Sequence, residues 1–134
     1  MIRSELQAIF VNLAEKEKIK GHHSPEGRAI RTLSRALNGW SAGNLSDADV
    51  LVLCDQAMED WLKARLKLST WSTRALAQLA VMAIKKEWIT RGEATRLKQI
   101  RDARLRLHEQ ADSISIPNVE AALEFCIRLV EKHW

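Results

Sequence analysis

The chain has 134 residues, of which 46% are hydrophobic and 28% are charged, with a formal net charge of +4 at pH 7. This length suits one domain with a core of its own, and no apolar run approaches the roughly 20 residues that a membrane-spanning helix needs. The composition therefore excludes a membrane-spanning protein and a small disulfide-stapled scaffold. The isoelectric point near 9.3 is compatible with an acidic partner but does not identify one.

The periodicity of the apolar residues predicts helices throughout, because alternating β-branched runs and hairpin turns are missing from the sequence. Six helices are expected, at about 2–18, 24–39, 46–67, 72–88, 92–111 and from 117 onward. The third has two apolar stripes, so we expect it to be either a central helix or a dimer helix. The glycine-rich turn 38–46 predicts a boundary between an N-terminal helical arm, residues 1–45, and a compact unit, residues 46–134.

Signals at the helix starts agree with these boundaries. Ser46 with Asp49, and Thr90 with Glu93, have the spacing of N-terminal capping boxes. The short connections between the last four helices predict an antiparallel bundle. Phe125 does not fit the pattern, because it falls on the polar side of the last helix. We interpret it as covered by the N-terminal helices or as part of a subunit interface.

The cysteines and the paired histidines of the chain do not indicate a metal or redox site. Cys54 and Cys126 fall on predicted core faces without the spacing of a ligand or redox motif, so we interpret them as small hydrophobic residues. His22 and His23 lie in a predicted loop and are interpreted as part of a solvated turn. We expect no metal and no cofactor. The segment Met1–Glu5 is charged and does not resemble a secretory signal, so a cytoplasmic location is expected.

One constellation in the predicted fifth helix indicates chemistry. On a helix that advances about 100° per residue, Arg101, Arg104 and His108 fall in one narrow wedge where apolar residues are expected. Burying such groups is costly unless they meet carboxylates, water or an anion such as phosphate. The wedge therefore serves catalysis, phosphate binding without turnover, or structural pairing of both arginines with acids around a neutral histidine. The candidate acids are Asp55, Glu59 and Asp60.

Several segments of the compact unit together resemble the HEPN domains, a superfamily of small helical bundles from prokaryotic toxins and defence systems. They are Cys54–Lys63, Trp88–Ala94, Leu97–Asp102, His108 and Ser113–Ser115. The family motif is an arginine, usually followed by a polar residue, with a histidine a few positions later. Arg101-Asp102 and His108 match its longest spacing, whereas its commonest spacing would place the arginine at Ala103, beside Arg104. The resemblance covers about two-thirds of the chain, from 47 to 134.

The resemblance implies an all-α fold, namely an antiparallel four-helix bundle, here with two additional N-terminal helices. It also implies RNA cleavage without metal, in a cleft between two domains of a dimer. His108 would be the general acid or base and Arg101 the phosphate clamp, because imidazoles exchange protons near neutral pH and guanidiniums hold phosphate oxygens. Arg104 would bind the phosphate as a second clamp, and Asp102 is the supporting polar residue.

Two functions from different classes follow from these observations. The first is a metal-independent endoribonuclease or RNA-binding defence protein of toxin type, acting as a homodimer on RNA, with a cognate antitoxin protein as a further partner. The second is a catalytically inactive bundle of the same type that serves as a protein-interaction module, either by binding a partner or as a structural dimer. Cleavage of RNA in EDTA that is lost in His108→Ala separates the two.

Overall fold

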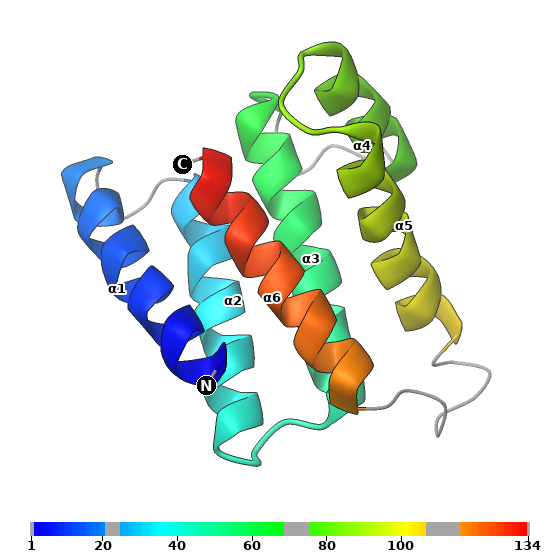
Figure 1. Ribbon diagram of the computed structural model, residues 1–134. Helices are drawn as coiled ribbons and strands as arrows, with labels where there is room; N and C mark the ends of the chain where they lie inside the picture. Colours follow the sequence, from blue (N-terminus) through cyan, green and yellow to red (C-terminus); the bar gives the residue numbers. More distant parts are fainter. Residues whose placement is uncertain (1, 21–24, 69–75, 107–115, 134) are drawn as a thin grey trace.

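The computed structural model describes residues 2–20, 25–68, 76–106 and 116–133, and within these ranges the chain is helical and has no strand (Figure 1). The helices are α1 (Ile2–Lys20), α2 (Pro25–Ser41), α3 (Asp47–Arg65), α4 (Leu76–Lys85), α5 (Arg91–Arg106) and α6 (Ile116–His133). The all-α class expected from the sequence is confirmed. The expected helical positions 72–75 and 107–111 lie outside the described residues. No helix in the described part of the chain is long and apolar enough to cross a membrane.

Both predicted capping boxes are present. The Ser46 hydroxyl accepts a hydrogen bond from the Asp49 backbone N–H, and the Ser46 N–H donates to the Asp49 carboxylate, both at 3.2 Å. At the start of α5 the Thr90 hydroxyl accepts from the Glu93 N–H at 3.1 Å, and the Thr90 N–H donates to the Glu93 carboxylate at 2.8 Å. These bonds satisfy backbone donors that the first helical turn leaves without partners, so both helix starts are fixed locally.

The ends of α3 and α4 differ from the prediction for a common reason. Each helix stops in a Schellman motif whose left-handed position is occupied by a residue other than glycine, Lys67 at φ 58° and Glu87 at φ 61°. The Leu68 N–H donates to the Lys63 carbonyl, and the Trp88 N–H donates to the Ala83 carbonyl. Because these stops lack glycine, the sequence does not reveal them, and the expected ends at 67 and 88 were too late.

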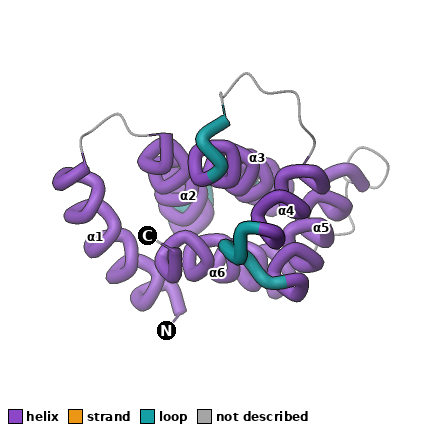
Figure 2. The backbone as a smooth tube through the Cα atoms, turned by 90° about the horizontal axis from the view of Figure 1, so that it is seen from above, coloured by secondary structure: helices purple, strands orange, loops and turns teal. Residues whose placement is uncertain are grey.

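Helix α3 lies at the centre of the molecule and packs against α2, α4, α5 and α6. Figures 1 and 2 show α6 lying over α2 and α3, with α1 at one edge and the α4–α5 pair at the other. One continuous apolar core receives side chains from all six helices, and each fully buried large side chain contributes on the order of 1.5–3 kcal/mol. Its deepest members include Leu6, Leu33, Trp61, Leu79, Leu97 and Leu123.

The N-terminal helices belong to this same core. The packing of α2 against α3 is the most extensive between any two helices, and α1 packs against α2 and α6. The side chains of Leu33 and Leu37 in α2 are fully buried. The division of the chain at residue 45 therefore stays a prediction about the sequence, since the apolar core continues across it.

Candidate functional site

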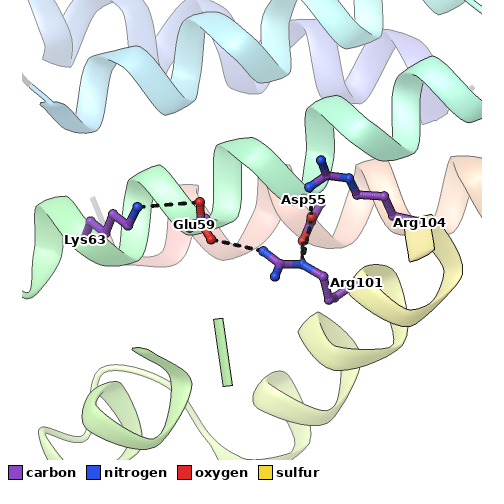
Figure 3. A network of polar contacts seen from close by, with 5 residues as sticks. All are labelled: Asp55, Glu59, Lys63, Arg101 and Arg104. Carbon is purple, nitrogen blue, oxygen red and sulfur yellow. Dashed lines mark hydrogen bonds and ion pairs between the residues drawn. The ribbon is translucent and has the colours of Figure 1, made fainter. Parts of the chain in front are cut away.

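The two arginines of the predicted wedge lie one turn apart near the C-terminal end of α5 and face α3. On α3, Asp55 and Glu59 also lie one turn apart and face α5. Figure 3 shows the side chains from the two helices pointing toward one another, together with Lys63 one turn further along α3. Residues three or four positions apart lie on the same face of a helix, so the pairs 55/59 and 101/104 can meet in one contact between neighbouring helices.

Asp55 is the hub of this contact. The Arg101 Nε donates to both carboxylate oxygens of Asp55 at 2.8 Å, and the Arg104 Nη1 donates to Asp55 Oδ2. The Arg101 Nη2 also donates to Glu59 Oε1 at 3.1 Å, and the Lys63 Nζ lies 3.6 Å from Glu59 Oε2. We call these five residues the Asp55 network.

Burial differs sharply between the members of the Asp55 network. The Asp55 side chain is 0% exposed, whereas those of Arg101 and Arg104 are 24% and 34% exposed. Burial disfavours the charged guanidinium of Arg101, but its hydrogen bonds with Asp55 and Glu59 outweigh this effect and raise the pKa of Arg101. The arginine therefore keeps its charge, and the fully buried carboxylate of Asp55 has the charged partners that such a group requires.

The structure brings together only part of the predicted site. Arg101 and Arg104 converge, and they do so on Asp55 and Glu59, as in the structural-pairing interpretation. Among the described residues, Asp60, the third acid considered there, forms no ion pair with either arginine. Asp102 is exposed. His108 lies outside the described residues, so its convergence with the arginines and its role as general acid or base stay predictions.

Chemically, the Asp55 network is better suited to fastening helices than to binding phosphate. Two of the three guanidinium nitrogens of Arg101 already donate to carboxylates. A phosphate that approached the same guanidinium would be repelled by the negative charges of Asp55 and Glu59, which are hydrogen-bonded to it. Helix α5 packs against α3 and α4, and the network supplies charge-assisted hydrogen bonds across the first of these contacts. The arrangement holds α5 at a fixed rotation against α3.

The two cysteines form a contact that the sequence did not indicate. Cys54 on α3 and Cys126 on α6 are both fully buried, and their thiols are close enough to hydrogen-bond. That hydrogen bond is the main cause that raises the pKa of Cys126, followed by burial. Cys126 therefore packs as a protonated thiol, and the burial of both cysteines fits the interpretation as small hydrophobic residues. Within the described ranges, no group of three or more His, Cys, Asp or Glu side chains could hold a metal ion.

The other face of α5 borders an open groove against α6, with a volume of about 530 Å³. Its floor contains the apolar residues Phe125 and Leu129, the small residues Gly92 and Ala121 lie on its two walls, and its rim is charged. The Arg96 guanidinium lies over the Phe125 ring at 4.6 Å from the ring centroid. Phe125 is thus half-buried, with a residue of α5 over its ring, while its cover by the N-terminal helices and its place in a subunit interface stay predictions.

Most charges on the rim of this groove are paired. Lys132 on α6 lies 3.3 Å from Glu93 on α5 and bridges the groove. Arg128 contacts Glu124 at 2.9 Å and Glu5 of α1 at 3.2 Å, and Glu124 chiefly raises the pKa of Arg128. Arg96 is the exception, because among the described residues it stacks on Phe125 and meets no carboxylate within ion-pair distance. The rim therefore leaves one cation available to a ligand.

The sequence alone missed this groove because its two walls are about 30 residues apart and only the fold brings them side by side. The one available signal was Phe125 among polar neighbours on α6. The chain matches no protein-family model, no curated protein and no solved structure.

Proposed function

We propose that this chain is a protein-interaction module without ribonuclease activity, in which α3–α6 correspond to a HEPN-like bundle and α1 and α2 are additions to it. The observation that carries the proposal is the pairing of Arg101 and Arg104 with Asp55 and Glu59 inside the chain. These arginines stabilise the position of α5 and are poorly placed to neutralise a phosphate in a transition state.

A second observation favours interaction over a purely structural role. The α5–α6 groove combines an apolar floor with a charged rim, which is the usual composition of surfaces that bind other proteins. We propose a partner protein as its user. The homodimer and the cognate antitoxin expected from the resemblance stay predictions, and sedimentation velocity with and without the co-expressed product of the neighbouring gene measures both.

The endoribonuclease is the second candidate function. It is favoured by the partial exposure of Arg101 and Arg104, which lie together on one face of α5 only a few residues before His108. In that case Asp55 and Glu59 would position the arginines instead of neutralising them. The pairing with Asp55 and Glu59 would still leave each arginine at least one guanidinium edge that could donate to a phosphate of a bound RNA.

RNA cleavage in EDTA decides between the two candidates. We expect no cleavage by the wild type and no difference between it and His108→Ala, and a stable complex with the co-expressed neighbouring protein. Cleavage by the wild type that disappears in His108→Ala, with an unchanged circular dichroism spectrum, overturns the proposal in favour of the nuclease. Retention of RNA without cleavage, with an affinity that falls steeply with salt, overturns it in favour of a nucleic-acid binder.

A further inference from the structure

The α5–α6 groove is long as well as open. Its α6 wall extends from Ala121 to Lys132, which corresponds to about 16 Å along a helix that rises about 1.5 Å per residue. A strip of this length matches three turns of a helix or about five residues of extended chain. The shape is therefore better suited to a peptide segment than to a compact metabolite.

The floor of the groove offers a place for an apolar anchor. Phe125 is half-buried and packs against the core, Leu129 is buried beside it, and Ala121 is exposed and too small to fill the space above. A Cβ atom added to Gly92 on the opposite wall would meet only the Thr90 hydroxyl, at 3.8 Å, so that wall is open as well. Ala121 and Gly92 therefore leave room for an apolar side chain beside Phe125, next to the Arg96 guanidinium that lies over its ring.

The rim determines the charge of the occupant. Its two acids, Glu93 and Glu124, each contact a cation of the chain, whereas Arg96 has none of the described carboxylates as a partner. A segment with a carboxylate beside its apolar anchor would pair with Arg96, and a basic segment would be repelled. A second copy of this chain carries the same net charge of +4, which disfavours it as the occupant relative to an acidic partner.

We propose that the α5–α6 groove binds an acidic peptide segment of a partner protein, with an apolar side chain beside Phe125 and a carboxylate on the Arg96 guanidinium. This proposal rests on the proposed function, since it names the surface through which the interaction module acts. Electrostatic attraction between the segment and the basic chain would also increase the association rate, to an extent that falls with ionic strength.

The probe is a synthetic 12-residue peptide with leucines at helical spacing and glutamates elsewhere. Its matched control has lysines in place of the glutamates. With the full-length protein labelled with ¹⁵N, we expect the glutamate peptide to shift the amide signals of Gly92, Ala121 and Leu129, and fluorescence anisotropy to give its affinity. The lysine peptide should leave these signals unchanged.

Variants on the two sides of α5 test the geometry. We expect Arg96→Ala to weaken binding of the glutamate peptide about tenfold, the scale of a lost charge-assisted hydrogen bond. Lys98→Ala removes the same charge from the opposite side of α5 and should change the affinity less than twofold. Gly92→Leu should abolish binding, since its side chain projects into the groove and meets no backbone.

Three outcomes overturn the proposal. They are equal binding of the lysine and glutamate peptides, shifts confined to residues outside the groove, and no shift at millimolar glutamate peptide. Each of these leaves the proposed function standing if RNA cleavage is absent and the complex with the co-expressed neighbour forms. Conversely, His108-dependent cleavage together with peptide binding in the groove overturns the proposed function and leaves the groove assignment intact.

Discussion

Helix α5 presents arginines to two neighbours, and the two faces use them differently. Toward α3, Arg101 and Arg104 donate to a carboxylate that is fully buried. Toward α6, Arg96 lies over an aromatic ring at the edge of an open groove, without a described carboxylate beside it. The three residues are of one type and lie within nine positions of the same helix. Their availability to a ligand is therefore set by what the opposing helix supplies.

This comparison explains why a wedge of cations is an ambiguous signal in a sequence. A buried arginine is retained in a fold when acids of the same chain meet it, and it is retained at a binding site when the ligand does. The more conspicuous pair, on the predicted apolar side, belongs to the first case. The less conspicuous Arg96 is exposed at the groove, where we propose that a ligand meets it.

The largest expected effect comes from removing the hub of the Asp55 network. Asp55→Asn keeps the shape of the side chain but leaves Arg101 and Arg104 without their shared carboxylate. We expect a loss of about 2–4 kcal/mol in the free energy of unfolding, toward the lower end of the usual range for fully buried pairs because both arginines are partly exposed. Urea unfolding followed by circular dichroism measures it.

Two matched variants set the scale of that measurement. Glu59→Gln removes a carboxylate that is 29% exposed and contacts only one of the two arginines, so a loss of about 1 kcal/mol is expected. Glu124→Gln makes the same change on the rim of the groove, where the paired Arg128 is exposed, and should barely move the urea midpoint. If Asp55→Asn, Glu59→Gln and Glu124→Gln all lower the free energy of unfolding by the same amount, the ion pairs on the two faces of α5 contribute equally to stability and the comparison fails.

The helices and their starts were predictable from the sequence because these features are local. Apolar periodicity placed all six helices, and the Ser46 and Thr90 capping boxes were identified from their spacing. The helix ends were less predictable, since Lys67 and Glu87 adopt the left-handed conformation without being glycine. Sequence spacing carries little information about such ends.

The candidate site was only partly predictable because it depends on contacts distant in sequence. The arginine wedge followed from the helical repeat, but Asp55 lies 46 residues from Arg101. Three acids were candidates, and only the packing of α5 on α3 selects Asp55 and Glu59. The groove depends likewise on the approach of α6 to α5. Phe125 indicated that some surface there was unusual, without showing which helix completes it.

A smaller effect of opposite sign is expected on the open face of α5. Gly92 is exposed in the first turn of the helix, and an added Cβ would find only an ordinary contact. Gly92→Ala should raise the free energy of unfolding by about 0.4–1 kcal/mol, because alanine loses less conformational entropy on folding. Differential scanning calorimetry would show a higher Tm.

Gly39→Ala is the control for that substitution, because it introduces the same methyl group into a closed environment. A Cβ at Gly39 in α2 would lie 2.6 Å from the Leu45 Cγ, so the Leu45 side chain must move. We expect Gly39→Ala to lower the Tm, since overpacking is destabilising. A lower Tm for Gly92→Ala as well would show that the wall of the groove is closed at Gly92.

The smallest expected effect concerns Asp60, which shares α3 with Asp55 but lacks its arginine hydrogen bonds. Burial raises the pKa of Asp60, and the charges of Arg28 and Lys63 offset this only in part. Because the pKa is higher in the folded state than the ordinary value of 3.8, the ionised carboxylate weakens the fold at neutral pH, and this cost disappears as pH falls below 3.8. Asp60→Asn should therefore raise the urea midpoint slightly at pH 7 and leave it unchanged near pH 3. The opposite sign at pH 7 would mean that Arg28 and Lys63 compensate Asp60 fully, and the contrast between Asp55 and Asp60 would then disappear.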